Sequence, residues 1–453
     1  MGATSGMMIY MISAIAQIIS FVCGTCLTWS SPVQTILNST STTPLDQVYD
    51  PDSSETAWIT SLLTVGAIFG SPLFGMAAGK FGRKPILVFL GVPFVISYLL
   101  LAFSKNLYCF YFARAFSGLA LGGVFTVIPM YSGEIAEDSN RGMLGAAMNC
   151  FITLGLLASV TLGPYIDFMW FNVILTIFPA MFVVLFLIFC PESPYFLIKK
   201  DFGKAEEALR LIRGTYDVSK ELSIIKNTVE KSEGGSFMDI VQDKGNRKAF
   251  LIGAGLIFFQ QFSGINIVLF NGTTVFEAAG GDMPPEYGPI IIAIVQFLTS
   301  FITPIFSDRS GRKILLFISH TCMLTVQIFF GLYFFMQKND PSSVENYSWL
   351  PITTLVIYIT AYNTGSGPIP WAVLGELFPS NIKDLAASGA SAVCWICGFI
   401  ITFTYPFFKN SIGIGITFWI FSGFGVFAAL FIVMFVIETK GKSLQQIQDE
   451  LSS

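Results

Sequence analysis

Long apolar blocks separated by short polar stretches form the main pattern of this 453-residue chain. A helix needs about 20 apolar residues to cross a bilayer, and lipid admits only structures whose backbone groups pair internally. The blocks predict twelve spanning helices, near residues 7–29, 56–79, 85–104, 107–132, 142–163, 168–190, 249–275, 287–307, 313–336, 351–375, 384–408 and 412–437. We therefore expect an all-α membrane protein.

The longest polar stretch, residues 191–248, divides the predicted spans into six and six. Its segments, such as KAEEALRLIR, have the amphipathic pattern of short helices that lie in water. The predicted organisation is an N-terminal six-helix bundle at 1–190, a short helical cytoplasmic linker at 191–248, a C-terminal six-helix bundle at 249–437 and a cytoplasmic tail at 438–453.

Positive charge predicts the orientation, because Lys and Arg near span ends are retained on the cytoplasmic side. All but four of the 25 Lys and Arg residues lie in the linker, the tail or the loops after even-numbered spans, and the exceptions are Lys105, Arg114, Lys338 and Lys409. Both termini are therefore predicted to be cytoplasmic. Asn38 and Asn346 begin Asn-x-Ser/Thr sequons in loops that fall outside, so both are predicted glycosylation sites.

Composition narrows the function classes. With 53% hydrophobic and 12% charged residues and a net charge of −4, the expected partner is the lipid bilayer and not nucleic acid. Two Cys-x-x-Cys pairs, beginning at Cys23 and Cys394, have metal-site spacing, but they lie in predicted spans, and the chain has one His. No metal or cofactor is therefore predicted. The sequence also has no GxxxxGK[ST] loop and no catalytic constellation, which argues against an ATP-driven pump or an enzyme.

A short motif occurs once in each half. GKFGRKP follows the second predicted span and DRSGRKIL follows the eighth, so one Gly-Arg-Lys triplet recurs at the same place. A basic turn suits any cytoplasmic loop, but two copies in register favour an internal duplication. Many carriers are built from such repeats, with the substrate site between the halves.

Over almost its whole length the chain resembles the sugar porters of the major facilitator superfamily, which include facilitative glucose transporters and insect trehalose and hexose transporters. The resemblance rests on PMYSGEIAEDSNRG at 129–142, PESPYFLIKK at 191–200, QQFSGINIVLF at 260–270, DRSGRK at 308–313, GPIPWAVLGELFPSNIK at 367–383 and ETKGKS at 438–443. It implies the major facilitator fold and sugar transport by alternating access in the plasma membrane. We expect the protein to act as a monomer.

Uncharged amides suit a sugar site, because they donate and accept hydrogen bonds as hydroxyl groups do. The QQFSGIN segment supplies three such amides, and Gly264 between them predicts a break or a bend in the helix. By resemblance, the substrate-binding residues are Gln260, Gln261, Asn266, Gln296, Trp371 and Trp395, with Asn149 and Asn363 at two further pocket positions. The alternatives are amides that only join helices, and tryptophans that anchor or pack.

Several pocket positions depart from the glucose-transporter pattern. Asn149 replaces a Gln, Asn363 an acid, and Cys394 an Asn, while Asn271 and Gly272 replace a Tyr-Ser-like pair that helps to close the outer gate. Because these changes alter the size and polarity of the pocket, glucose is not assigned. A hexose, a polyol or a disaccharide such as trehalose stays open.

A second group of residues is charged and lies at predicted cytoplasmic span ends. Its members are Arg83, Glu134, Arg141, Asp308, Arg309, Arg312, Glu376 and Lys383. The resemblance implies that they form salt bridges between spans and to the linker, closing the inner face when the carrier opens outward. The alternative is a solvated basic rim.

The first predicted span holds no Asp, Glu or His from Met7 to Trp29, where proton-coupled members of the family keep an Asp. The predicted function is therefore facilitative uniport of a sugar, with a proton-coupled symporter and a non-transporting sugar receptor as alternatives. Arg114 lies within the fourth span, where an Arg costs about 2.5 kcal/mol or more, so it must face the protein interior. A structural clamp and a substrate role are equally open for it.

Overall fold

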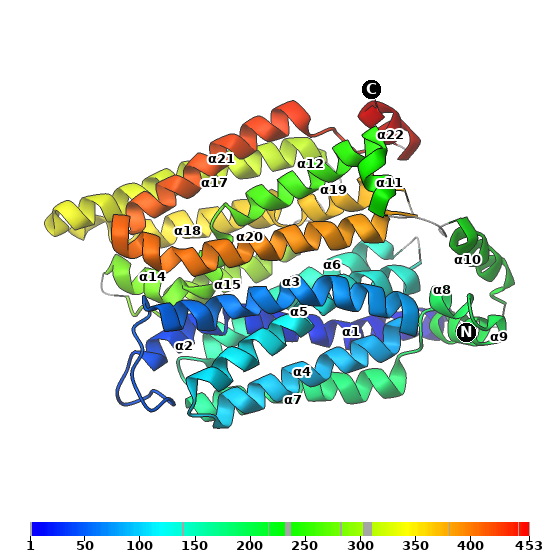
Figure 1. Ribbon diagram of the computed structural model, residues 1–453, viewed down its shortest axis with the longest axis horizontal. Coiled ribbons are helices and arrows are strands. Elements are labelled where there is room, and N and C mark those ends of the chain that lie inside the picture. Colours follow the sequence, from blue (N-terminus) through cyan, green and yellow to red (C-terminus); the bar gives the residue numbers. More distant parts are fainter. Residues whose placement is uncertain are drawn as a thin grey trace.

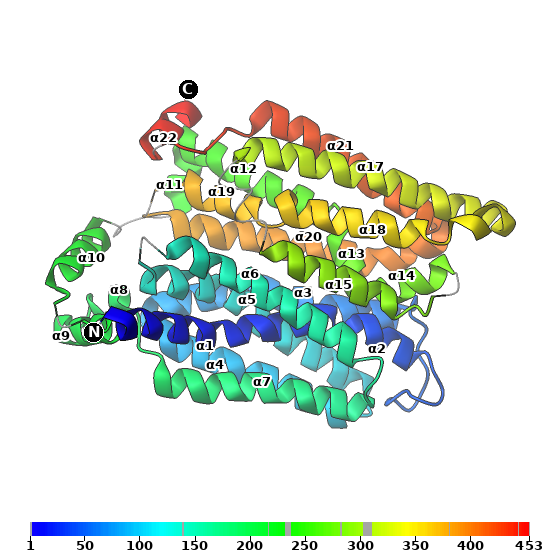
Figure 2. The same cartoon turned by 180° about the vertical axis from the view of Figure 1, so that it is seen from behind.

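The computed structural model describes residues 2–137, 140–215, 217–231, 237–280, 283–301, 310–379, 381–442 and 444–452. Long helices run side by side along the molecule (Figure 1). Helices from the first half of the sequence lie together, next to those from the second half, and both views show this division (Figures 1 and 2). We call the end that carries the chain termini and helices α8–α11 the linker end, and the opposite end the far end.

Seven helices build the first half and four short ones build the linker. The first half consists of α1 (Gly2–Thr28), α2 (Ser30–Leu37), α3 (Ser54–Phe81), α4 (Arg83–Phe103), α5 (Leu107–Ile135), α6 (Arg141–Leu162) and α7 (Phe168–Phe189). The linker consists of α8 (Pro194–Leu197), α9 (Phe202–Arg213), α10 (Ser219–Lys231) and α11 (Phe237–Gln242). The predicted helical linker is therefore present.

The second half contains more breaks. Its elements are α12 (Lys244–Gln261), α13 (Ile265–Phe270), α14 (Gly272–Ala279), α15 (Tyr287–Ser300), α17 (Arg312–Asn339), the 3-10 helix η1 (Pro341–Tyr347), α18 (Leu350–Ala361), the π-helix η2 (Tyr362–Ser366), α19 (Ile369–Leu377), α20 (Lys383–Ile412) and α21 (Ile414–Phe435). The tail forms α22 (Leu444–Ser452).

Nine helices in the described part of the chain are long and apolar enough to cross a membrane. The other three predicted spans are the interrupted series α12–α14, the shorter apolar helix α15, and the series α18, η2 and α19. The all-α, twelve-helix architecture is therefore confirmed, and its interruptions lie in the second half.

Glycines bring α3 and α5 into backbone contact. Gly66 and Gly70 lie on α3 and Gly118 and Gly122 on α5, each pair four residues apart and thus on one helix face. A Cβ atom at Gly118 would lie 2.0 Å from the carbonyl oxygen of Leu63, which no side chain tolerates. Such close approach is a main source of helix association in lipid, where the hydrophobic effect is absent.

The repeated Gly-Arg-Lys triplet forms the sharp turn between α3 and α4. Gly82 has φ of +112°, a conformation that favours glycine. The turn exposes the first N–H groups of α4, and the carboxylate of Glu192 accepts those of Arg83 at 2.9 Å and Lys84 at 3.2 Å. The PESP motif therefore caps α4.

The second half repeats this arrangement before α17. Gly311 has φ of +89°, and Glu438 of the ETKGKS motif accepts the N–H groups of Arg312 at 2.9 Å and Lys313 at 3.1 Å. Burial raises the pKa of Glu438, but backbone N–H groups outweigh burial and lower the pKa below its usual value. Equivalent caps in the two halves agree with the duplication that the sequence indicates.

Candidate functional site

The seventh span breaks at the predicted glycine. Helix α12 ends at Gln261 and α13 begins at Ile265, and between them Gly264 has φ of +84°. A Cβ atom there would also lie 2.7 Å from the ring of Phe421. The break places Gln260 and Gln261 on the last turn of α12.

Gln261 and Asn266 form a buried amide pair across this break. The Nδ2 of Asn266 donates to Oε1 of Gln261 at 2.6 Å, and Nε2 of Gln261 donates to Sγ of Cys394 on α20 at 3.1 Å. A Cβ atom at Gly398 would lie 3.1 Å from Asn266 Nδ2 and 3.5 Å from Thr64 Cγ2 of α3. The pair therefore lies at the boundary between the two halves.

Gln260 points to a different partner. Its Nε2 donates to the carbonyl oxygens of Ser366 at 2.8 Å and Gly367 at 2.6 Å, where η2 gives way to α19. These carbonyls lack α-helical partners, and an unpaired carbonyl in lipid is costly. Gln260 thus joins the interruptions of the seventh and tenth spans, and its amide N–H groups are engaged by the protein itself.

Asn363 and Gln296 form a second polar group next to η2. Asn363 Nδ2 donates to the backbone oxygen of Gln296 at 3.0 Å and to Oγ1 of Thr299 at 2.8 Å. Within the described residues the side-chain oxygen of Gln296 is buried with no hydrogen-bond partner. Gln296 also lines a small cavity with Thr28 of the first half. An orphaned buried acceptor between the halves is suited to a hydroxyl donor.

The two tryptophans lie in different surroundings. Trp395 is buried, donates through Nε1 to Ser71 Oγ of α3 at 3.2 Å, and contacts Phe125 of α5 edge-on at 5.3 Å between ring centroids. It therefore bridges the halves. Trp371 is half-buried on α19 and packs against the core of the second half. Asn149 is half-buried on α6.

Several buried polar side chains that the sequence did not single out form hydrogen bonds to the broken helices. Gln327 Nε2 and the Tyr358 hydroxyl both donate to the backbone oxygen of Ser263, at 2.6 and 3.0 Å. Ser366 Oγ of η2 lies 2.8 Å from Nδ1 of His320, which is buried. Their sequence signal is a polar residue within an apolar span. Gln327 and Tyr358 supply partners to a backbone oxygen that the break releases, and His320 bonds a side chain of η2.

At the far end the two halves are bonded together. Ser30 Oγ of α2 donates to the Phe270 carbonyl oxygen at 2.9 Å, and Gln34 Nε2 donates to Oδ1 of Asn271 at 2.8 Å. Asn271 is thus at the halves' contact, at a position that the resemblance assigns to the outer gate. The far end is closed in this structure.

An ion pair strengthens this closure. Lys409 Nζ, at the end of α20, lies 2.7 Å from the carboxylate of Asp52, just before α3. Their side chains are 17% and 25% exposed, so the pair is partly shielded from solvent and stronger than a surface pair. The residues are 357 positions apart, and the sequence reading placed neither in a pair.

At the linker end the predicted charged residues pair within each half. Arg83 Nη2 lies 2.6 Å from Glu134 and joins α4 to α5, while Arg312 Nη2 lies 3.1 Å from Glu376 and joins α17 to α19. Lys383 is exposed at the start of α20. Asp308, Arg309 and the side chain of Arg141 lie outside the described residues.

The linker contacts the first half through an arginine that the sequence reading missed. Arg213 at the end of α9 donates to the carbonyl oxygen of Ile135 at 2.7 Å and pairs with Glu221 of α10 at 2.6 Å. It also lies 3.5 Å from Glu137, three residues after Glu134. The linker is therefore tied to the end of α5.

Arg114 has the geometry of a clamp. Its Nε donates to the Ile59 carbonyl oxygen of α3 at 3.0 Å and its Nη1 to the Cys26 carbonyl oxygen of α1 at 3.1 Å. The guanidinium also lies 5.0 Å from the ring of Trp29, at the junction of α1 and α2. The structural reading of Arg114 therefore fits these contacts, and a substrate role stays untested.

The predicted glycosylation positions, Asn38 after α2 and Asn346 in η1, are both exposed. Their use as glycosylation sites stays a prediction.

A bundle of membrane helices with interrupted spans that meet between two halves, closed at one end, is the architecture of a membrane carrier. Residues 2–451 match the family model described as "Sugar (and other) transporter". The chain belongs to this family of sugar transporters, as the sequence motifs predict, and is a transporter and not an enzyme.

Curated relatives and solved structures agree with this family assignment. The chain is 35% identical over 411 residues to the facilitated trehalose transporter Tret1 of Bombyx mori, covering 89% of this chain and 80% of the relative. It is 34% identical over 442 residues to Tret1 of Polypedilum vanderplanki, covering 95% and 86%. A partially occluded inward-open structure of the xylose transporter XylE from E. coli matches with a TM-score of 0.80 and 25% identity, covering 96% of this chain and all of that one.

Proposed function

We propose that this protein is a facilitative uniporter for a sugar of hexose or small disaccharide size, with trehalose as the first candidate. The observation that carries the proposal is the Gln261–Asn266 amide pair, which lies between the halves beside Gly398 and Thr64. Trehalose is favoured because the relatives at 35% and 34% identity are named facilitated trehalose transporters. The protein would act as a monomer in the plasma membrane, with the linker end cytoplasmic.

The polar groups of the site suit a neutral polyhydroxylated ligand. Gln261 and Asn266 would exchange their mutual bond for bonds to sugar hydroxyls, and the orphaned oxygen of Gln296 would accept another. Trp395 would cover the apolar face of a sugar ring and already contacts both halves. Asn149, Asn363 and Trp371 are further pocket candidates, whereas Gln260 acts through the two broken spans.

Alternating access would follow from rocking of the two bundles, residues 1–190 and 249–437. The bonds of Gln34 with Asn271 and of Lys409 with Asp52 close the far end, so opening outward requires them to break. Each is a neutral hydrogen bond or a partly exposed ion pair, worth about 1 kcal/mol. Contacts of this size suit a switch between two states of similar free energy.

Uniport is favoured by the surroundings of Arg114. Its partners are the carbonyl oxygens of Cys26 and Ile59 and the ring of Trp29, all uncharged. The nearby hydroxyl of Thr25 bonds the Tyr98 hydroxyl at 2.7 Å. A symporter needs a group in the pathway that titrates near working pH. XylE is named a proton:xylose symporter, so the fold alone does not decide the coupling.

Uptake by the purified protein in liposomes tests this proposal. Labelled trehalose, glucose and a polyol are each offered under two conditions: down a sugar gradient, and with no sugar gradient but an inward proton gradient. We expect saturable exchange of at least one sugar, no accumulation, and no effect of a protonophore on downhill uptake. Accumulation that a protonophore abolishes would establish symport, and binding without uptake would establish a receptor.

Glu376→Gln tests the proposed role of the linker-end charges. The change keeps the shape but removes the charge of Glu376, which pairs with Arg312 within its own half in this structure. We propose that the same carboxylate also helps to close the inner face when the carrier opens outward, so its loss should shift the population toward the inward-open state. A reporter cysteine at Ser388, which faces Gly75 of the other half, should then react faster with a soluble maleimide. An equal or slower rate would mean that Glu376 belongs only to a solvated rim.

A further inference from the structure

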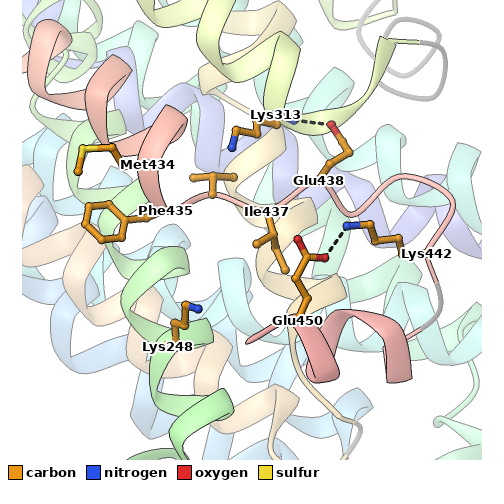
Figure 3. Close-up of a pocket in the computed structure, with 9 residues that line it drawn as sticks. Lys248, Lys313, Met434, Phe435, Ile437, Glu438, Lys442 and Glu450 are labelled. Carbon is orange, nitrogen blue, oxygen red and sulfur yellow. Dashed lines mark hydrogen bonds and ion pairs between the residues drawn. The ribbon is translucent and has the colours of Figure 1, made fainter. Parts of the chain in front are cut away.

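A cavity of about 480 Å³ lies at the linker end, outside the space between the halves. Its lining comes from α12, α17, the end of α21 and the tail with α22 (Figure 3). The lining residues are Lys248, Lys313, Met434, Phe435, Val436, Ile437, Glu438, Lys442 and Glu450. The pocket is therefore built by four separate parts of the second half and its tail.

Three lysines from three different elements converge on this cavity. The amine of Lys313 donates to the Val433 carbonyl oxygen at 3.0 Å, and Lys442 pairs with Glu450 of α22. Lys248 has no side-chain ion pair or hydrogen bond within the described part of the chain. The close-up shows Lys248 and Lys313 lining the pocket from two different helices (Figure 3).

Glu438, the other glutamate of the lining, is hydrogen-bonded to backbone N–H groups and not to the lysine amines. The carboxylate of Glu438 accepts the backbone N–H groups of Arg312, Lys313 and Lys440, at 2.9, 3.1 and 3.0 Å. Those bonds fix it as the cap of α17. With three ammonium groups against two carboxylates, the pocket keeps an excess of positive charge and open donor positions for an anion.

One side of the pocket is apolar and exposed, as expected of a surface that faces lipid. Met434 and Phe435 are 70% and 50% exposed at the end of α21, a helix apolar enough to span a membrane. With α21 as a spanning helix, its end at Phe435 would lie near the bilayer surface, so the lysines of the same pocket would reach phospholipid headgroups. A soluble anion would use only the lysines, whereas a lipid would also cover the two exposed apolar side chains.

We propose that this pocket binds the phosphate-bearing headgroup of an anionic phospholipid from the cytoplasmic leaflet, held by Lys248 and Lys313, with its acyl chains along Met434 and Phe435. The proposal rests on the cytoplasmic orientation of the linker end and is independent of the sugar carried. The tail helix α22 forms one wall, with Ile447 and Leu451 buried against the bundle, so a bound lipid would fix the tail to the bundle.

The test titrates the purified full-length protein in detergent with a short-chain phosphatidylinositol phosphate, with bound lipid counted by native mass spectrometry. Phosphatidylcholine is the neutral comparison. Each basic residue near a membrane surface contributes about a fivefold affinity change, so the double variant Lys248→Gln, Lys313→Gln should bind the anionic lipid at least tenfold more weakly. The matched control is Lys84→Gln, because Lys84 occupies the equivalent Gly-Arg-Lys position of the first half; its affinity should be unchanged.

Two further measurements separate the remaining outcomes. The double variant Lys248→Arg, Lys313→Arg keeps the charge and should retain the lipid, which distinguishes lost binding from lost folding. Soluble inositol phosphate should bind far more weakly than the lipid. Equal lipid affinity in the glutamine variant and the unmutated protein would overturn the proposal. Equally tight binding of soluble inositol phosphate would also overturn it, because the ligand of the pocket would then be a soluble anion and not a lipid.

Discussion

Gly118→Ala should abolish most of the folded, surface-expressed protein. The added Cβ atom would lie 2.0 Å from the carbonyl oxygen of Leu63, and backbone atoms cannot move aside as the end of a flexible side chain can. Overpacking costs about 1–3 kcal/mol where neighbours adapt, and here α3 and α5 would have to separate along their whole contact. The measurement is the monodisperse fraction in detergent together with the thermal unfolding midpoint.

The control for this prediction lies on the same helix. A Cβ atom built on Gly133 of α5 would meet no atom of another helix within 4 Å among the residues that the structure describes, so Gly133→Ala should express and unfold like the unmutated protein. Any effect of lower glycine content or altered helix propensity is common to both variants. Normal expression and stability of Gly118→Ala would show that α3 and α5 are not in the backbone contact described here.

The sequence predicted the positions of the membrane helices because lipid imposes one dominant rule, the length of an apolar run. Predicted span 168–190, for example, corresponds to α7 at Phe168–Phe189, and span 107–132 to α5 at Leu107–Ile135. A break or a bend at Gly264 was also predicted, because glycine lets the helix depart from its regular geometry between the amides. The π-helical form of η2 was not, since only the tertiary contacts of Gln260 and Ser319 select it.

The contacts between the halves were harder to predict. Asp52 and Lys409 are separated by most of the chain and carry no local pattern, so their pairing follows only from the way the two bundles meet. The linker-end residues Arg83 and Glu134 were identified by their positions in motifs. The motifs did not show that the two residues pair with each other within the first half. Arg114 was predicted in part. The cost of an Arg in lipid predicted that its side chain faces the protein interior, whereas only the structure identified its carbonyl partners.

The different roles of Gln260 and Gln261 could not be predicted from the sequence either, because the two are adjacent amides of one motif. In the structure Gln260 Nε2 donates to the Ser366 and Gly367 carbonyls, whereas Gln261 bonds Asn266 and Cys394 near the other half. One longer bond of 3.4 Å, from Gln261 Nε2 to Gln260 Oε1, joins the two side chains. Adjacent residues on a helix point about 100° apart, so one faces the tenth span and the other the boundary. The two glutamines are therefore expected to respond differently to the same substitution.

Gln261→Leu should raise the half-saturation constant for sugar at least fivefold while leaving the amount of folded protein near normal. The change keeps the bulk of the side chain but removes its hydrogen bonds, and it also removes the acceptor of Asn266 Nδ2. A lost hydrogen bond costs about 1 kcal/mol, and a buried polar group left unpaired about 1–3 kcal/mol, so larger effects are expected if a sugar hydroxyl loses its partner. Initial rates of labelled sugar uptake over a concentration series measure it.

Gln260→Leu is the matched comparison for this last prediction. It leaves the Ser366 and Gly367 carbonyls without their side-chain donor in a lipid-surrounded bundle, so we expect a lower unfolding midpoint and a lower maximal rate. The half-saturation constant should change less than in Gln261→Leu, because the Gln261–Asn266 pair remains. Unchanged transport kinetics in Gln261→Leu would remove this amide from the sugar site, and identical behaviour of the two variants would show that both glutamines only hold the helices together.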